Sequence, residues 1–312
     1  IPSPTEEDSR MESWYRTVGI RGISRLSLRT TDRSVGGRGL FLSTTTQSKR
    51  AVFRGEIVAH IPATLVLTKS NYATGESKLR NVGWPIVLTA LAFLASSHDD
   101  NILAPWIRAW GDGGVEAPIS PDNLNDEKVQ NLAALTGVAS SIIREASAAR
   151  HDTYLRDSLV LKRILHDVFN IDVRDDLDND RLVASLYSVI LSRTANLGQE
   201  WNNQRGVIPL HDMINHCEDN SCIELMTVGD VKRFTDINKL WEQSEEFLNN
   251  NSKRDNDGME SVKDRDILLV ASRDILPGDE LFLNYRQGKT GRKVEDEEKA
   301  WLSLQYGFPI AK

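Results

Sequence analysis

The sequence predicts an α+β fold in which a β-rich domain is interrupted by a long helical segment. Residues 36–67 alternate apolar and polar side chains around glycine and proline turns, as in "GGRGLFLSTT" and "GEIVAHIPATLVLT", which is typical of short strands. From residue 81 to about residue 193 the apolar residues recur at helical spacing. After Val207 the strand pattern returns in "CIELMTV", "ILLVASRDI" and "ELFLNY". We therefore expect one sheet assembled from both ends of the chain, with two independent domains as the alternative.

Two helices of the middle region carry recognisable signals. Asn125 precedes two acidic residues and an apolar series that ends before Gly137, which predicts a capped start and a glycine stop. A second helix is expected from about Arg181, because its apolar residues recur three and four positions apart. Its last turn brings Arg193 to the end of the helical region.

The predicted boundaries divide the chain into three segments. Residues 1–80 are expected to form the N-terminal part of the β-rich domain, 81–190 the helical insertion and 191–312 the C-terminal part. Within the last segment, residues 245–266 are polar, rich in asparagine and nearly free of large apolar groups. That composition predicts a mobile surface loop.

The composition argues against two classes of partner. With 38 basic and 45 acidic residues the net charge is −7, the wrong sign for a protein that neutralises nucleic-acid phosphates. No uninterrupted apolar run reaches the ~18 residues that a membrane-spanning helix needs. We therefore expect a protein or small-molecule partner, and neither nucleic acid nor membrane. Two cysteines in 312 residues cannot form a disulfide scaffold, which favours an intracellular compartment: cytoplasm, nucleus or plastid.

Four candidate metal ligands lie in the stretch "IPLHDMINHCEDNSC", namely His211, His216, Cys217 and Cys222. Structural zinc sites draw ligand pairs from two elements, whereas all four residues lie on one short segment. Adjacent His216 and Cys217 would point to opposite faces of an extended chain, so we expect no metal. A disulfide between the cysteines conflicts with a reducing compartment, and the remaining interpretation is two small, partly buried apolar side chains.

Five fragments occur in the order found in one family: "GGRGLFLS", "GEIVAHIP", "IPLHDMINH", "GDELFLNY" and "LSLQYGF". Over about residues 36–310 the sequence resembles the SET-domain protein methyltransferases. The combination of "DMINH" with a helical insert is similar to the subgroup that includes Rubisco large-subunit lysine methyltransferase and the actin histidine methyltransferase. The resemblance implies a SET fold with a knot-like crossing of the C-terminal chain and S-adenosyl-L-methionine as cofactor.

The resemblance also implies the residues that bind the cofactor. The glycine turn Gly37, Arg38 and Gly39 would present backbone groups to it, since glycine lets a backbone approach a ligand closely. Asn215 and His216 would hold its amino acid and adenine portions, because both side chains offer donors and acceptors. Taken from the residues alone, the turn could be an ordinary one and His216 a core histidine.

Four more positions match family residues around the methyl group and the substrate channel. Arg193 would contact the cofactor and the channel, Asp212 would line the substrate entrance, and Tyr306 would wall the channel. Tyr285, at the end of "GDELFLNY", would direct its hydroxyl at the transferred methyl group and is the predicted catalytic residue. From the residues alone, these could be a surface arginine, a turn-capping aspartate and two core tyrosines.

The implied function is methyl transfer to a lysine side-chain nitrogen of a non-histone protein. A histidine acceptor fits the same resemblance, because a neutral imidazole needs no prior deprotonation. A catalytically silent binding module is another alternative, since the segment "RQGKTGRKVEDEEKAWLSLQ" after Tyr285 departs from the family pattern. A zinc-dependent interaction protein is the last. The chain ends soon after "YGF", so we expect the helical substrate-binding domain of Rubisco methyltransferase to be absent.

Overall fold

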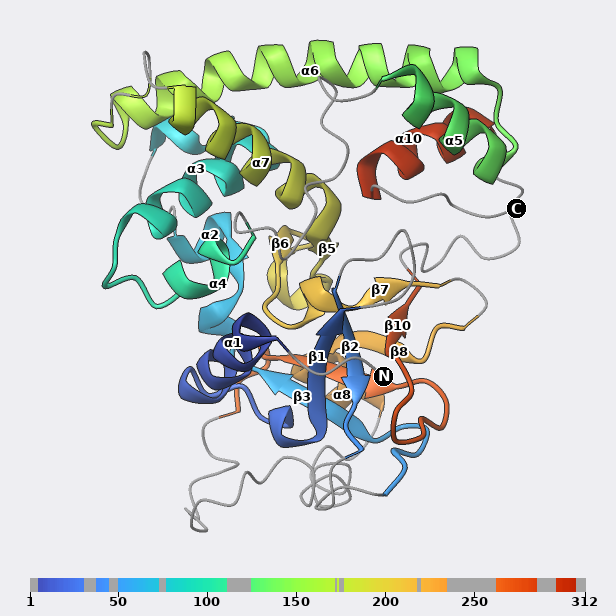
Figure 1. The fold of residues 1–312 in the computed structure, drawn as a ribbon. Coiled ribbons are helices and arrows are strands. Elements are labelled where there is room, and N and C mark those ends of the chain that lie inside the picture. Colours follow the sequence, from blue (N-terminus) through green and yellow to red (C-terminus); the bar gives the residue numbers. More distant parts are fainter. Residues whose placement is uncertain are drawn as a thin grey trace. The chain divides into compact units, whose positions relative to one another are not determined.

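A computed structural model describes most of the chain, and its elements are drawn in Figure 1. The described residues group into two compact units, each built from separated pieces of the sequence. The sheet unit comprises Ile1–Asp32, Gly36–Val66 and Ala195–Thr290, and the helical unit comprises Arg33–Val35, Leu67–Thr194 and Gly291–Lys312. The described residues are 5–30, 38–44, 50–72, 77–110, 125–171, 173, 177–217, 220–234, 262–284 and 296–306.

The sheet unit opens with a helix that covers the edge of a two-stranded ladder. Strand β1 (Leu26–Thr30) pairs antiparallel with β2 (Arg38–Leu42). Helix α1 (Glu6–Thr17) packs against β1, and the Glu12 carboxylate accepts a hydrogen bond from the Leu28 N–H at 3.0 Å. Because this bond satisfies a backbone donor of a strand with one neighbour in its sheet, α1 protects β1 and fixes the β1–β2 pair.

A glycine at the entrance to β1 lets two backbones pass at close range. Gly22 has a φ of +91° and precedes the 3₁₀ turn η1 (Ile23–Arg25). A Cβ atom at this position would lie 2.2 Å from the carbonyl oxygen of Val58, in strand β3 (Ile57–Ile61). Only glycine fits here, because both the backbone conformation and the available space exclude a side chain.

We expect Gly22→Ala to destabilise the protein far more than Gly19→Ala does. Gly19 has a similar φ of +86° but no atom within 4 Å of a built Cβ, so its substitution costs only the backbone term of about 1–2 kcal/mol. Gly22→Ala adds a clash with backbone that cannot rotate away. Denaturant unfolding of the two variants measures the difference, and equal stabilities would contradict the close approach.

The larger sheet of this unit has the strand order β3–β9–β8–β10–β7. Strands β3, β9 (Ile267–Ala271) and β8 (Ile223–Thr227) are antiparallel neighbours, and β10 (Phe282–Leu283) and β7 (Asn215–His216) complete the sheet. Every residue of β3 and β9 is buried. Their nearly continuous apolar sequences, "IVAHI" and "ILLVA", are therefore those of strands covered on both faces.

Strand β10 lies between two strands that are consecutive in the sequence, and it runs parallel to both. Cys217 directly follows β7, and Cys222 directly precedes β8. The Cys217 N–H donates to the Leu283 carbonyl at 3.1 Å, and the Cys222 N–H donates to the Phe282 carbonyl at 3.0 Å. A late strand is thus enclosed by an earlier segment, in agreement with the crossing that the family resemblance implies.

Shorter elements complete the sheet unit around these strands. They are η2 (Ala63–Leu65), β5 (Thr194–Asn196, whose first residue groups with the helical unit), η5 (Gln199–Trp201), β6 (Arg205–Val207), η6 (His211–Met213) and α8 (Val228–Phe234). Strands β5 and β6 are neighbours in a small sheet.

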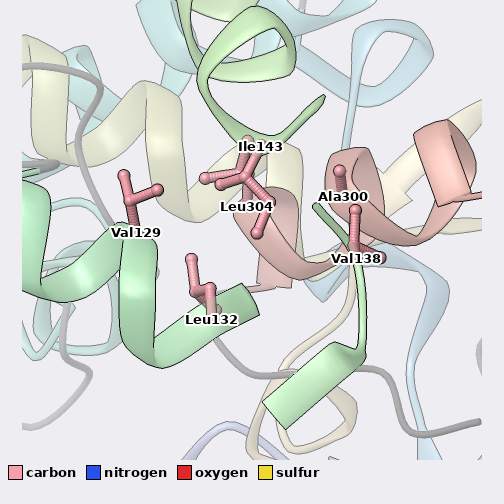
Figure 2. Close-up of a cluster of buried hydrophobic side chains, with 6 residues drawn as sticks. All are labelled: Val129, Leu132, Val138, Ile143, Ala300 and Leu304. Carbon is pink, nitrogen blue, oxygen red and sulfur yellow. The ribbon is translucent and has the colours of Figure 1, made fainter. Parts of the chain in front are cut away.

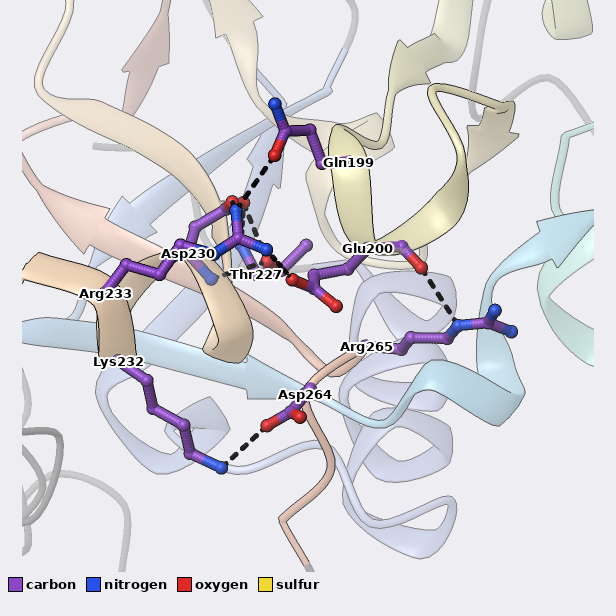
Figure 3. Close-up of polar contacts among 8 residues, drawn as sticks. All are labelled: Gln199, Glu200, Thr227, Asp230, Lys232, Arg233, Asp264 and Arg265. Atoms are coloured by element: carbon purple, nitrogen blue, oxygen red, sulfur yellow. Dashed lines mark hydrogen bonds and ion pairs between the residues drawn. The ribbon is translucent and has the colours of Figure 1, made fainter.

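A group of polar contacts holds α8 against the turn that enters β9 (Figure 3). Lys232 pairs with Asp264 at 2.7 Å, Arg233 pairs with Glu200, and the Arg265 Nε donates to the Glu200 carbonyl at 3.0 Å. Each exposed pair is worth at most about 1 kcal/mol. Together they hold the residues that precede and follow the segment 235–261 close to each other.

The predicted mobile loop 245–266 lies mostly outside the described residues. Its last five residues, 262–266, are described and structured. Asp266 is 4% exposed and accepts hydrogen bonds from His60 Nε2 at 2.9 Å and from the N–H groups of Ala63 and Lys263. The loop prediction is therefore too long at this end, because a buried carboxylate with several donors anchors the chain.

These contacts make the stability of the sheet unit dependent on pH. Burial alone would raise the pKa of Asp266, but hydrogen bonds from His60 and two backbone N–H groups outweigh it, and the pKa is lowered from 3.8. A lowered folded-state pKa contributes stability that is present above the unfolded value and is lost as pH falls through the folded value.

We expect Asp266→Asn to lower the free energy of unfolding at pH 7 by about 3 kcal/mol, because His60 and the Lys263 N–H lose their acceptor. The difference from wild type should shrink as pH falls from about 3.8, the ordinary value, through the lower pKa of the folded carboxylate. Urea unfolding at pH 7 and pH 3 measures it. A difference independent of pH would show that the charge of Asp266 does not matter.

The helical unit is organised around one long helix, α6 (Ser140–Asp167), shown in Figure 1. Helices α5 (Asp126–Thr136) and α10 (Asp296–Tyr306) pack against it, as does α3 (Trp84–Ser97), which also packs on α7 (Leu177–Arg193). Its other elements are β4 (Leu67–Thr68), α2 (Lys69–Tyr72), η3 (Ser77–Leu79) and α4 (Ala104–Arg108). No helix in the described part of the chain combines the length and apolar character needed to cross a membrane.

The predicted signals of α5 are confirmed. The Asn125 side chain accepts from the Lys128 N–H at 2.9 Å, and Gly137 ends the helix with a φ of 70°. Helix α7 begins at Leu177, four residues before the predicted start near Arg181, and ends at Arg193 as expected.

The helical unit takes in more of the chain than the predicted insertion 81–190, because α10 belongs to it. Figure 2 shows Ala300 and Leu304 of α10 among apolar side chains of α5, α6 and the segment between them. The cluster consists of Val129, Leu132, Val138, Ile143, Ala300 and Leu304, all at most 5% exposed. Burial of this apolar face joins the last helix to the middle of the sequence.

Candidate functional site

The candidate site of the sheet unit is assembled around the segment that leads into β10. This segment pairs with β2: the Leu281 N–H donates to the Leu40 carbonyl at 2.7 Å, and the Leu42 N–H donates to the Asp279 carbonyl at 2.9 Å. Glu280 forms an antiparallel bridge with Phe41 between them. Strand β2, which contains Arg38 and Gly39 of the predicted glycine turn, is therefore fixed directly to the chain that leads toward Tyr285.

On its other side, the same chain reaches the predicted Asn-His pair. Asn215 lies opposite Phe282 and His216 lies opposite Leu283 in the parallel β7–β10 ladder. The Asn215 Nδ2 also donates to the Glu280 Oε1 at 2.8 Å. Backbone and side-chain hydrogen bonds thus join β2, the segment before β10, and β7 in one continuous arrangement.

For three predicted residues of this group, Gly37, His216 and Tyr285, the structure describes the backbone alone or nothing. Gly37 and Tyr285 lie outside the described residues, but each is the chain neighbour of a described one, Arg38 and Asn284. The backbone of Arg38 lies in β2 beside Gly39. His216 is described in its backbone. The described chain therefore brings together the segments that carry these residues, while the roles of their side chains remain predictions.

Asp212 reaches the site through a strained turn. Leu210 has φ 71° and ψ −45°, an unusual conformation for a residue with a side chain, and the turn η6 follows it. Such conformations cost about 1–3 kcal/mol and persist where the surrounding structure imposes them. Leu210 is 1% exposed and Asp212 is 2% exposed, and η6 packs against β2. The turn therefore places a buried carboxylate close to β2.

Two other predicted residues belong to the helical unit. Arg193 is the last residue of α7 and is half-buried, and Tyr306 is the last residue of α10, with only its backbone described. Their predicted roles in cofactor and substrate binding stay predictions.

Glu280 is the residue of this site that sequence reasoning missed. It lies inside the quoted fragment "GDELFLNY", where only the terminal tyrosine was singled out. A carboxylate at the entrance to a buried strand is itself a signal, because acidic side chains are rarely placed there without a partner. Its partner, Asn215, is 65 residues away in the sequence and could not be found from spacing.

The cysteines of the opening stretch lie on opposite sides of β10. Because neighbouring strands are about 4.8 Å apart, the backbones of Cys217 and Cys222 are separated by roughly 9–10 Å, too far for a disulfide. Burial raises the pKa of the Cys222 thiol, although the hydrogen bond from the Phe282 N–H acts in the opposite direction. The raised pKa disfavours the thiolate, which is the form that binds zinc. Among the side chains that the structure describes, no group of three or more His, Cys, Asp or Glu could hold a metal ion.

A family profile described as "SET domain" matches residues 37–286, about four-fifths of the chain. The chain belongs to the SET-domain family. A comparison with curated protein sequences finds no significant match.

Among solved structures, the chain is similar to the SET domain of LSMT bound to lysine and AdoHcy, with a TM-score of 0.62 and 14% identity over 99% of this chain and 58% of that one. It is also similar to Rubisco LSMT bound to sinefungin and monomethyllysine, with a TM-score of 0.60 and 14% identity over 98% and 57%. A third match, Rubisco LSMT bound to AdoMet, has a TM-score of 0.58 and 12% identity over 98% and 57%.

These similarities show the fold, a SET fold of mixed helices and sheets. The chain spans somewhat less than three-fifths of the length of the solved proteins that it matches.

We expect both cysteines to remain free thiols after purification without reductant, because β10 keeps them apart. Mass spectrometry of the alkylated, unreduced protein should then show two modified cysteines per chain. A species lacking both modifications and lighter by two hydrogens would reveal a disulfide and would contradict the strand order around β10.

Proposed function

We propose that the protein transfers a methyl group from S-adenosyl-L-methionine to a lysine side-chain nitrogen of a non-histone protein. The observation that carries the proposal is the hydrogen-bonded series from β2 through Glu280 and β10 to Asn215 and His216. It gathers the segments that hold the predicted cofactor residues and the chain that leads to Tyr285, in a protein of the SET-domain family.

The described groups suit a cationic cofactor. The sulfonium and the ammonium of S-adenosyl-L-methionine are both positive, and the Asn215 amide, whose Nδ2 donates to Glu280, carries an acceptor oxygen at its other end. Gly39, in β2, brings backbone groups to the same region without a side chain. The solved relatives bound to AdoMet, AdoHcy or sinefungin add support for this class of cofactor.

Catalysis would depend on position more than on a strong base. The cofactor supplies an electrophilic methyl group, and the acceptor nitrogen needs a free lone pair. A lysine with a pKa of about 10.4 must lose its proton, and a buried channel beside a positive charge favours the neutral amine. Tyr285 would align the amine and contact the methyl group through weak C–H···O interactions. Holding the reactants in line can contribute about 7–11 kcal/mol.

A lysine acceptor is favoured over histidine because two similar structures hold lysine or monomethyllysine. The net charge of −7 supports a protein partner rather than a nucleic acid. The low cysteine content leads us to propose an intracellular location.

Incubation with labelled cofactor and a cell lysate, followed by mass spectrometry of the labelled peptide, identifies the acceptor. Labelled histidine would replace the lysine assignment, and the absence of any label would contradict the methyltransferase.

We expect Tyr285→Phe to lower turnover by roughly 10²–10³ while the protein stays folded, by analogy with the loss of one preorganised donor. Its affinity for S-adenosyl-L-methionine, measured by calorimetry, should stay close to that of wild type. Tyr154→Phe, on α6 of the helical unit, is the matched control and should retain full turnover. Unchanged methylation by Tyr285→Phe would remove this residue from the mechanism, and wild-type protein that binds no cofactor would reject the proposed function.

A further inference from the structure

The hydrogen bond between Asn215 and Glu280 has a direction that matters for ligand binding. An ionised carboxylate only accepts hydrogen bonds, whereas the Asn215 amide carries a donor end and an acceptor end. The Nδ2 end faces the Glu280 Oε1 at 2.8 Å. The oxygen and nitrogen ends of an amide have nearly the same shape, so the hydrogen-bonding partner determines which end faces it. Glu280 therefore determines which end of Asn215 faces it and which end faces away.

Glu280 is itself held at both its backbone and its side chain. Its bridge to Phe41 ties it to β2, and the flanking bonds from Leu281 to Leu40 and from Leu42 to Asp279 remove freedom on either side. The next strand, β10, is fixed on both edges by β7 and β8. The carboxylate thus approaches Asn215 from a rigid platform, and its half-buried position strengthens the interaction relative to bulk water.

We infer that Glu280 is a positioning residue, which orients the Asn215 amide so that its Oδ1 accepts a hydrogen bond from a positively charged or N–H-bearing group of the cofactor. The inference rests on the proposed function. Reversal of the amide would set Oδ1 against the carboxylate, two acceptors in contact with no proton between them. Glu280 excludes that orientation before the ligand arrives, so binding does not have to select it.

The substitution Glu280→Gln tests this role because it keeps the size of the side chain and its ability to form hydrogen bonds. It removes the restriction that the side chain can only accept them. A glutamine amide can donate to Oδ1 or accept from Nδ2, so both orientations of Asn215 become available. We expect the Kd for S-adenosyl-L-methionine to rise about twofold, because two equally available orientations of Asn215 leave half of the unliganded protein competent to bind. The turnover number at saturating cofactor should stay within about threefold of wild type, since Glu280 does not touch the methyl group.

Three comparisons separate positioning from other effects. S-adenosylhomocysteine, which has the ammonium but no sulfonium, should lose affinity by the same factor. Asn215→Ala should weaken binding more, by about tenfold, because the Oδ1 acceptor itself is lost. Adding Glu280→Gln to it should cause little further loss, because the carboxylate acts through the amide. Glu224→Gln, the same change at an exposed position of β8, is the matched control and should bind as wild type does.

The results that overturn the inference are distinct from those that overturn the proposed function. Equal affinities of Glu280→Gln and Glu224→Gln, additive losses in the double variant, or a loss confined to the sulfonium compound would each reject positioning through Asn215. Wild-type protein that binds neither compound would reject the proposed function and this inference with it. If Glu280→Gln fails to fold, as judged by circular dichroism and thermal unfolding, Glu280→Met takes its place under the same expectations.

Discussion

The sheet unit depends on one constraint: β10 is hydrogen-bonded along both edges to strands that precede it in the sequence. It is only two residues long, so its position cannot come from its own propensity. A shift of one residue would turn its side chains to the opposite faces and would break the bonds from Cys217 and Cys222. The register of β10 therefore decides where Glu280 lies before it and where the chain emerges after it.

Other features of the sheet unit support the same frame. Gly22 lets the chain entering β1 pass within contact of β3, and Glu12 closes the edge of β1. Beside the same strand, β3, Asp266 accepts hydrogen bonds from His60 and from two backbone N–H groups at the entrance to β9. Strain is concentrated at Leu210, directly before the buried Asp212. A rigid frame can hold such a turn, which a flexible one would relax.

The sequence predicted what is local and repeated. The end signals predict the capped helix from Asn125 to Gly137, and short apolar segments bounded by turns predict the strands on both sides of the helical region. The order of five fragments indicates the family, and the family profile covers residues 37–286, which leaves out only the last fragment, "LSLQYGF". These features depend on neighbours in the chain or on motifs of several residues.

The sequence does not show which distant segments pair in the sheets or which distant side chains are in contact. The segment "ELFLNY" predicts a strand that contains β10, but no local signal shows its pairing with β7 and β8, and the contact between Asn215 and Glu280 joins positions far apart in the sequence. Helix α10 was assigned to the C-terminal part of the β-rich domain, but Ala300 and Leu304 bury their side chains with α5 and α6. The loop prediction ran through Asp266 because composition alone cannot show that one carboxylate has several buried donors. In each case tertiary contacts overrode a local signal.

The central claim is that separated segments of the sheet unit surround one cofactor. Hydrogen–deuterium exchange with and without S-adenosylhomocysteine tests it most directly, because it reports backbone protection segment by segment. We expect ligand-dependent protection in the peptides that contain residues 38–42, 210–217 and 279–284, and little change in β3 or α8. Protection confined to one of the three segments, or located only in other parts of the sheet unit, would contradict it.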